Sequence, residues 1–267
     1  MTLRLNLVLG GLLLAAVAGT AATASVWTPF NPVAVNLRRR LAAPTDPYWL
    51  GTDEFGRDVL SRLMVGASTS LTVALVTVLV AMALGITIGL LAGFFRGWTD
   101  RALMALNDAL LAFPGILFAL GLLTVIGPSK WGIVLALGLA YAPAVARVVR
   151  GSVLSLRERE FVEASRALGN SEAYTLWRHV APNCVSPLTV LATSMFGWVI
   201  LSESALSFLG LGVPPPAPTW GNMLAAARPY LETATWLSIA PGVMIALSLL
   251  GTNLLGDALR DILDPRT

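Results

Sequence analysis

The sequence predicts an all-α membrane protein with six transmembrane helices, and the scarcity of charge is the first observation behind this. Of the 267 residues, 56% are apolar and only 12% are charged, against about 25% charged residues in an average soluble domain. So few charges cannot cover the surface of a water-soluble globule, and disorder needs the opposite composition. The second observation is that mostly apolar stretches of about 20 residues recur, which is the length that crosses the hydrocarbon core.

Six segments have this length and character. They span residues 5–26, 63–95, 102–126, 131–149, 185–209 and 233–255. The first has a competing interpretation as a cleaved signal peptide, because Arg4 precedes it and Ala22-Thr23-Ala24 has the form of a cleavage site. We expect this segment to be retained as an anchor, because its apolar stretch is long for a signal peptide.

The segment that precedes the second span carries four charges in six residues. These are Asp53, Glu54, Arg57 and Asp58. Oppositely charged residues three or four positions apart can pair on a helix, so residues 51–62 are expected to form a short helix at the membrane surface.

The second and third spans each carry a distinctive pattern. Gly85, Gly89 and Gly93 repeat at every fourth position, which permits close approach between membrane helices. Only Asp108 interrupts the third span, six residues before Pro114. A charge inside a span is costly, so we expect Asp108 to be anchored to an arginine or a helix terminus in preference to touching a substrate.

The connection between the fourth and fifth spans concentrates the charge of the chain. Residues 147–178 hold ten of the 33 charged side chains, six Arg and four Glu. Four small or apolar residues recur there at helical spacing: Phe161, Ala164, Ser165 and Leu168. Gly169 supplies a helix stop, and Ser171 can cap a second short helix. The pattern leaves open an amphipathic connector on the headgroups and a docking element for a partner protein.

The fifth span contains an acid, Glu203, between Ser202 and Ser204. An acid in a span usually faces a cavity or a partner, so Glu203 is a candidate pathway or gate residue, with a polar packing contact as the alternative. Residues 213–218 follow and hold four prolines, which makes this loop extended and stiff. It can serve as a rigid spacer or as a docking rim.

Arginine placement orients the chain in the membrane. If both termini are cytoplasmic, eleven of the 18 basic residues lie on the cytoplasmic side, where Lys and Arg are enriched in membrane proteins. The run from Arg38 to Arg40 opposes this bias, but it follows a long uncharged stretch. We therefore expect a multi-pass protein with cytoplasmic N and C termini.

Four stretches in fixed order resemble one family. EASRALG at 163–169, followed by HVAPN at 179–183, resembles the EAA motif of bacterial ABC importer permeases, with Ser165 in place of its second alanine. GTDEFGRDVLSR at 51–62 resembles a segment of dipeptide, oligopeptide and nickel permeases. The stretches SESALSFLGLG at 202–212 with PTWG at 218–221, and GDALRDILDP at 256–265, are also similar. The resemblance covers most of the chain from Pro47 onward.

The resemblance implies the C-type permease of a peptide-class ABC importer, with a type I importer fold. It divides the chain into an N-terminal anchor and extracytoplasmic segment, 1–62, and a permease domain, 63–267, with a coupling segment at 157–182. It further implies a homologous permease partner, two P-loop ATPases, an extracytoplasmic binding protein and a bacterial or archaeal inner membrane. The coupling helix would dock on an ATPase through six residues: Phe161, Glu163, Ala164, Ser165, Leu168 and Gly169. Asp53, Glu54, Arg57 and Asp58 would alternatively contact the binding protein or the sister permease.

Other functions are disfavoured by what the sequence lacks. No G-x-x-x-x-G-K-[ST] motif occurs, so we expect no cofactor on this chain, with ATP and Mg²⁺ on the ATPases. One His and one Cys argue against a metal site and against a membrane-embedded enzyme. The chain also lacks the basic stripe that is typical of nucleic-acid binding. An ion-driven secondary transporter would favour inverted repeats. Peptides are the expected substrate, with nickel chelates, opines and oligosaccharides as alternatives.

Overall fold

The computed structural model describes residues 2–263, and every regular element in that range is a helix. The main helices are α1 (Thr2–Ala24), α2 (Val59–Phe95), α3 (Gly97–Leu111), α4 (Gly115–Ile126), α5 (Lys130–Leu156), α6 (Glu160–Ala167), α7 (Glu172–Thr175), α8 (Val185–Phe208), α9 (Trp220–Ala227) and α10 (Trp236–Leu263). A π-helical turn, Leu176–Val180, and a 3-10 turn, Ala181–Cys184, join α7 to α8. Two further 3-10 turns are Leu37–Arg39 and Arg228–Tyr230. Asp264 and Pro265, which end the last matched stretch, lie outside the described residues.

Within residues 2–263, five helices are long and apolar enough to cross a membrane, or six if α3 and α4 together count as one span. The third span was expected to be one helix, but α3 and α4 meet at 89°. The break occurs at Pro114, which has no N–H to continue the helical ladder, and a proline also disfavours the helical conformation of the residue before it, Phe113. The third expected span is therefore a bent pair of helices.

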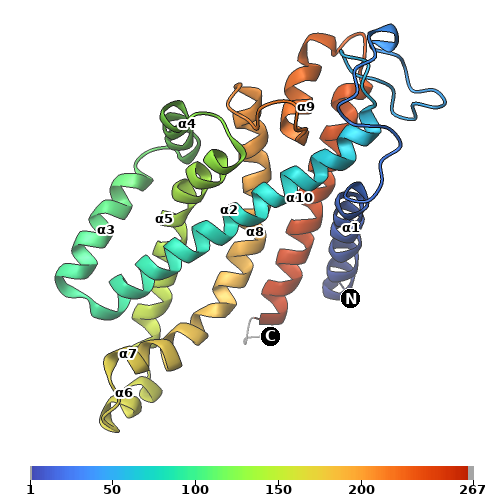
Figure 1. Ribbon diagram of the computed structural model, residues 1–267. Helices are drawn as coiled ribbons and strands as arrows, with labels where there is room; N and C mark the ends of the chain where they lie inside the picture. Colours follow the sequence, from blue (N-terminus) through green and yellow to red (C-terminus); the bar gives the residue numbers. More distant parts are fainter. Residues whose placement is uncertain (1, 264–267) are drawn as a thin grey trace.

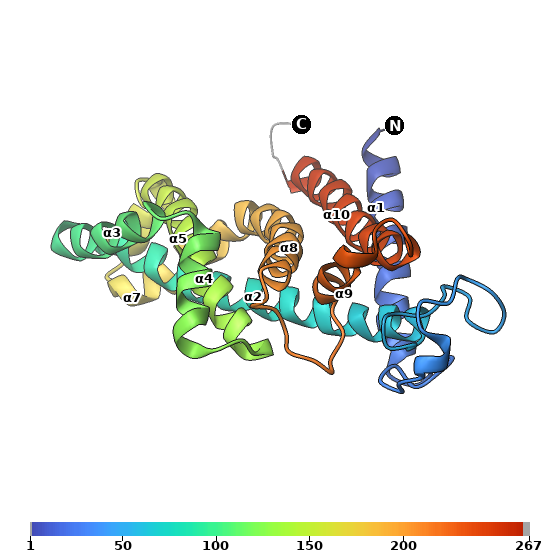
Figure 2. The same cartoon turned by 90° about the horizontal axis from the view of Figure 1, so that it is seen from above.

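The glycine repeat of α2 is the seam of the bundle. In Figure 1, α2 runs diagonally across α5, α8 and α10, and Figure 2 shows it on one side of that row of helices. A Cβ on Gly85, Gly89 or Gly93 would lie 2.4, 2.6 or 2.8 Å from the Cβ of a valine on α5. These valines are Val145, Val149 and Val153. The expected close approach is thus confirmed, and α5 of the same chain is its partner.

The N-terminal helix α1 packs against α10 by the same principle. A Cβ on Gly10 would lie 2.8 Å from the backbone nitrogen of Leu255, and one on Gly251 would lie 3.0 Å from Leu14 Cγ. Only residues without a side chain allow two helices to approach so closely. A retained anchor is expected to pack in this way, and its retention stays a prediction.

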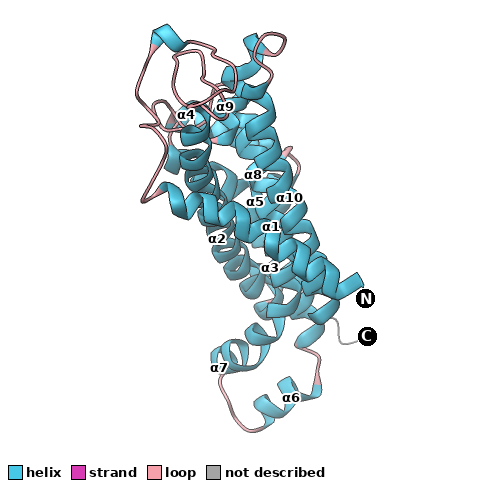
Figure 3. Cartoon of the chain, turned by 90° about the vertical axis from the view of Figure 1, so that its right-hand side faces the viewer, coloured by secondary structure: helices cyan, strands magenta, loops and turns pink. Residues whose placement is uncertain are grey.

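The bundle has two different ends, shown in Figures 1 and 3. One end, which we name the coupling end, carries α6 and α7, and the first turn of α1 and the last turn of α10 point the same way. The opposite end, which we name the loop end, carries residues 25–58, the proline-rich loop and α9. At the loop end, buried Trp220 fastens α9 to α2, because its Nε1 donates to the Leu63 carbonyl (3.2 Å) and its backbone N–H donates to Ser70 Oγ (3.1 Å).

Candidate functional site

The coupling segment folds as a short helix, a glycine bend and a second short helix, which confirms the sequence pattern. The glycine is Gly169, with φ of +80°, a conformation in which a Cβ is strained. Its N–H donates to the Arg166 carbonyl (2.9 Å), and the next N–H, of Asn170, donates to the Ser165 carbonyl (3.2 Å). These bonds end α6. Ser171 then caps α7, accepting from the Tyr174 N–H, so that the chain reverses within a few residues.

Ser165 lies in the seam between the two short helices, whereas the resemblance implied that it docks on an ATPase. Its side chain is almost fully buried, and its hydroxyl lies 3.0 Å from Thr175 Oγ1. Asn170 Nδ2 also donates to Ser165 Oγ, at 3.2 Å. Buried Val162 on α6 lines the same side. The small serine therefore packs the segment against itself, because this side of α6 faces α7.

The opposite side of α6 has no covering element in residues 2–263. Leu168 is 82% exposed and Phe161 is 40% exposed. Glu163, Ala164 and Gly169 are exposed beside them. We name these five residues the coupling face. A large exposed apolar surface with one acid, at the end of a bundle, is typical of a protein–protein contact.

Ion pairs and hydrogen bonds fix the coupling segment to the end of α2. Arg157 Nη1 donates to the Phe94 carbonyl at 2.6 Å. Arg96, which follows α2, pairs with Glu158 at 2.8 Å. A force on α6 is therefore transmitted to α5, which directly precedes it in the chain, and to α2 through these contacts.

Glu203 is sealed between α8 and α9. Its side chain is 1% exposed, and Ser207 Oγ donates to its Oε1 at 2.9 Å. The start of α9 covers it, because a Cβ on Gly221 would lie 2.6 Å from Ser204 Cα and 2.9 Å from Ser207 Cβ. The hydrogen bond from Ser207 lies within α8, so in this conformation Glu203 is a buried acid that α9 covers. A role as a gate requires α9 to move and stays a prediction.

Asp108 is anchored to an arginine, as its position in an apolar span led us to expect. Arg147 Nη2 of α5 donates to Asp108 Oδ1 at 2.7 Å. One turn closer to the coupling end, Arg150 grips Asp100 with two hydrogen bonds of 2.6 and 2.7 Å. Arg147, Arg150 and Asp100 carry no motif that predicts these pairs. Two arginines three residues apart beside an apolar span were the available signal.

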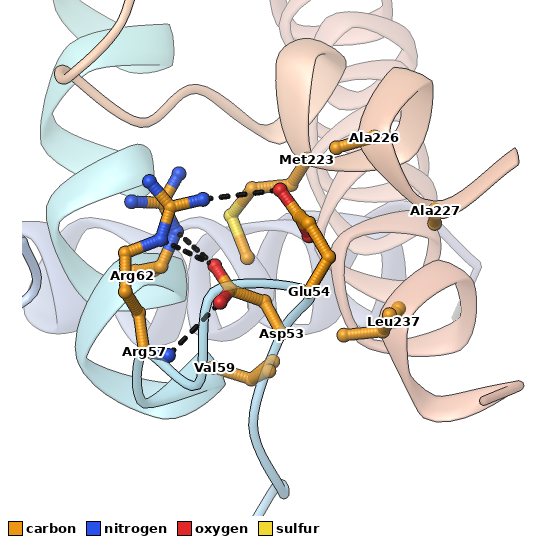
Figure 4. Close-up of a pocket in the computed structure, with 9 residues that line it drawn as sticks. All are labelled: Asp53, Glu54, Arg57, Val59, Arg62, Met223, Ala226, Ala227 and Leu237. Carbon is orange, nitrogen blue, oxygen red and sulfur yellow. Dashed lines mark hydrogen bonds and ion pairs between the residues drawn. The ribbon is translucent and has the colours of Figure 1, made fainter. Parts of the chain in front are cut away.

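The charged segment at the loop end is a tight turn and not the short helix that its spacing suggested. The expected pairing is confirmed: Arg57 contacts Asp53 (2.6 Å) and Glu54 (3.2 Å). Asp53 Oδ1 accepts hydrogen bonds from two backbone N–H groups, which stabilises the turn. Arg62 also pairs with Asp53, at 3.3 Å, and was missed because it lies inside α2. Figure 4 shows these side chains converging.

The remaining member of that segment, Asp58, caps α2. Its Oδ2 accepts from the backbone N–H of Ser61 (2.8 Å) and from the Ser61 hydroxyl (2.6 Å).

The loop end also holds a partly buried acid and a cavity. Burial is the main cause that raises the pKa of the Glu54 carboxyl above its ordinary value. Beside these groups lies a cavity of about 320 Å³, lined by Phe55, the prolines of residues 215–216 and the start of α2. Asn222 stiffens the proline-rich loop by donating to the Val213 and Ala217 carbonyls.

Comparison with known proteins agrees with this architecture. The family described as "Binding-protein-dependent transport system inner membrane component" matches residues 85–267. A putative peptide transport system permease protein of Brucella suis is 43% identical over 96% of this chain and 86% of the relative. The di/tripeptide transport system permease protein DppC of Pseudomonas aeruginosa is 42% identical over 97% of this chain and 88% of the relative.

Solved structures show the same fold at low sequence identity. Two crystal forms of the inward-facing MetNI methionine ABC transporter match with TM-scores of 0.61 and 0.63, at 18% and 17% identity. Each match covers 76% of this chain and 96% of the other. The helical bundle described above is therefore the fold of an ABC importer permease of type I.

Proposed function

Because the chain belongs to the family of binding-protein-dependent transport system inner membrane components, we propose that it is the permease through which di- and oligopeptides enter the cell. The relatives that are named as peptide permeases support this substrate class, since they are about 40% identical over nearly the whole chain. The substrate is set mostly by the binding protein. Nickel chelates, opines and oligosaccharides are therefore the alternatives that a transport assay has to exclude.

The proposed assembly contains a homologous permease, two P-loop ATPases and an extracytoplasmic binding protein, in the inner membrane of a bacterium or archaeon. This chain has no phosphate-binding loop motif, so ATP and Mg²⁺ would be bound by the ATPases. Both termini and the coupling segment would be cytoplasmic. The excess of basic residues on that side supports this orientation, as does the position of the chain ends in the fold.

The coupling face is the observation that carries the proposal. Leu168 is 82% exposed beside exposed Phe161, and burial of these grouped apolar side chains against a partner would stabilise the complex. The face would seat in a cleft of an ATPase, with Glu163 beside a basic group of that protein. Closure of the ATPase pair would then move α5 and α8 through the rigid coupling segment and open the pathway to the other side.

At the opposite end, the cavity beside Phe55 and the stiff proline-rich loop would form the docking rim for the binding protein. The loop is suited to this because Asn222 fixes its shape before any partner binds and so reduces the ordering cost of association. The buried Asp53–Arg57 pair supports the floor of the rim and need not touch the partner.

Uptake by the reconstituted assembly tests the substrate class. Proteoliposomes that contain this chain, its sister permease, the ATPases and the binding protein should accumulate a labelled dipeptide when ATP is supplied, and should do so without an ion gradient. Uptake driven by an ion gradient alone would favour the secondary transporter. Accumulation of a nickel chelate or an oligosaccharide with no peptide uptake would replace the peptide assignment.

A charge on the coupling face tests the docking surface. Leu168→Glu should weaken ATPase binding by about tenfold or more, because a buried unpaired charge costs several kcal/mol, and transport should fall with it. Leu231→Glu is the matched control, since Leu231 is 51% exposed at the loop end and should leave ATPase binding unchanged. Equal ATPase binding by both variants would contradict the proposed coupling face.

A further inference from the structure

The ion pair between Arg147 and Asp108 lies at an unusual place. Both side chains are more than 60% exposed, yet Arg147 is nine residues from the end of α5. That is about 13.5 Å at the helical rise. Because α5 is longer than the hydrocarbon core of about 30 Å, Arg147 lies just inside the boundary of the core on the coupling side, near the end of the expected span 131–149. Charged groups in this core face a bundle interior or a water-filled cavity, because lipid cannot solvate them. The pair therefore marks a side of the chain that does not face lipid.

The surface around the pair has the composition of such a side. On α5, Arg147 shares a stripe with Ala140, Ala144 and Gly151, at spacings of four, three and four residues. This stripe is opposite the valines that pack against α2. A Cβ on Gly151 would meet nothing within 4 Å. A lipid-facing stripe would carry large apolar side chains, as Leu106 of α3 does with 62% exposure.

The stripe of α3 that carries Asp108 has the same character. Arg101, Ala105, Asp108 and Ala112 follow one another at spacings of four, three and four residues, and all four are exposed. The two stripes meet at the ion pair. Together they form one surface of small and charged residues on two helices.

The break between α3 and α4 is a second, independent sign of the same surface. Ala112, Phe113 and Pro114 interrupt the helix and are exposed. Backbone that leaves the helical ladder at membrane depth is tolerated only where protein covers it or where it lines a water-filled cavity. The break lies little more than one turn beyond Asp108, so it borders the same surface.

The ion pair is not needed to hold α3 on α5. Asp100 and Arg150 make a bidentate pair at 2.6 and 2.7 Å that is much less exposed. Buried Asn107 Nδ2 donates to the Pro143 carbonyl at 3.2 Å. These contacts fasten the two helices, which leaves Arg147 and Asp108 free to exchange partners without loss of the fold.

We propose that Arg147 and Asp108 line the translocation pathway and bind the two charged termini of a peptide in transit. The Arg147 guanidinium would take the terminal carboxylate, for which its planar donors are suited, and the Asp108 carboxylate would take the terminal ammonium. Between substrates the two side chains neutralise each other. The pathway assignment rests on the geometry, and the identity of the ligand rests on the proposed function.

Uptake kinetics of the full reconstituted assembly test the peptide contact. Arg147→Gln should raise the KM for a dipeptide with a free carboxylate by about 10- to 100-fold, the loss expected for one charged hydrogen-bonding partner. A C-terminally amidated dipeptide that the binding protein accepts should be affected much less. Arg260→Gln, which removes an exposed arginine near the end of α10, is the control and should leave both KM values unchanged. Equal effects on the two peptides, or no effect, would overturn the proposed contact.

Thiol labelling tests the water-filled surface without any substrate. In a Cys184→Ser background, which removes the buried free cysteine, Ala105→Cys should react with a membrane-impermeant reagent about tenfold faster than Leu106→Cys, because the reactive thiolate forms only in water. Equal rates, or cross-linking of residue 105 to the sister permease with no labelling, would overturn the pathway assignment. An assembly that labels as expected but transports no peptide would overturn the proposed function and the peptide contact, and the aqueous surface would stand.

Discussion

The two ends of the bundle hold their charges in opposite ways. At the loop end, Asp53, Arg57 and Arg62 are 7%, 12% and 8% exposed and neutralise one another within the protein. At the coupling end, Arg96 and Glu158 are 48% and 67% exposed, and the coupling face stands open. Buried, mutually satisfied charges make a fixed frame, whereas exposed charges are free to contact another protein. The difference indicates that the loop end is built on a rigid frame, on which the proposed docking rim would stand, and that the coupling end is suited to an interface.

The largest effect should come from removing the centre of the buried cluster. Asp53→Ala would remove the ion pairs of Arg57 and Arg62 with Asp53 and leave two backbone N–H groups without an acceptor, while Arg57 keeps its contact with Glu54. Breaking a buried ion pair in this way costs about 3–5 kcal/mol. Thermal unfolding of the purified protein in detergent should show a clearly lower midpoint. Asp46→Ala, at an exposed acid of the same end, should not, and a normal midpoint for Asp53→Ala would remove the contrast between the ends.

A smaller and local effect is expected in the seam of the coupling segment. Ser165→Ala leaves the Thr175 hydroxyl without its partner, which costs about 1–3 kcal/mol for a buried group. Amide hydrogen exchange should accelerate in α6 and α7 and stay unchanged at the loop end. The double variant Ser165→Ala/Thr175→Val should recover part of the protection, because no buried hydroxyl is then left unpaired. Exchange that accelerates throughout the chain would show that the two ends are one cooperative unit.

The glycine bend should contribute still less. Gly169 has φ of +80° with open space around it, so Gly169→Ala costs only the strain of the left-handed conformation, about 1–2 kcal/mol. This destabilisation should be seen as faster hydrogen exchange of the amides around residue 169. Gly121→Ala is a matched control, because Gly121 also has open space but lies within α4 and should be neutral or slightly stabilising. Equal exchange in both variants would show that the bend needs no glycine.

The smallest effect concerns the pH dependence at the loop end. Because burial raises the pKa of Glu54, its contribution to folding is fully present below the unfolded pKa and is lost as the pH rises through the folded value. Glu54→Gln, which keeps the neutral form, should therefore be more stable than the wild type at pH 7, by less than about 1 kcal/mol. The difference should vanish at acid pH. A variant that is less stable at pH 7 would show that the pairing of Glu54 with Arg57 outweighs its burial.

The sequence predicted those parts of the fold that depend on neighbours along the chain. The spans follow from apolar length, and their positions agree with α1, α2, α5, α8 and α10 to within a few residues, apart from the ends of α5 and α10, which each continue further toward the coupling end. The bend at Gly169 follows from the steric freedom of one residue. The glycine repeat of α2 predicted close packing, because glycines at every fourth position lie on one face of the helix and let another backbone approach it.

Only the tertiary structure decided which side chains meet across the chain. Arg62 joins Asp53, Arg147 joins Asp108, and Ser165 turns inward to Thr175, although the resemblance implied a docking role for it. The angle between α3 and α4 was also beyond the sequence, because a proline indicates a break but not the direction in which the chain continues. Local composition determines whether a segment lies in lipid or in water, and it determines the short-range conformation. Contacts between distant residues depend on how the helices cross, and that is settled by the packing of the whole bundle.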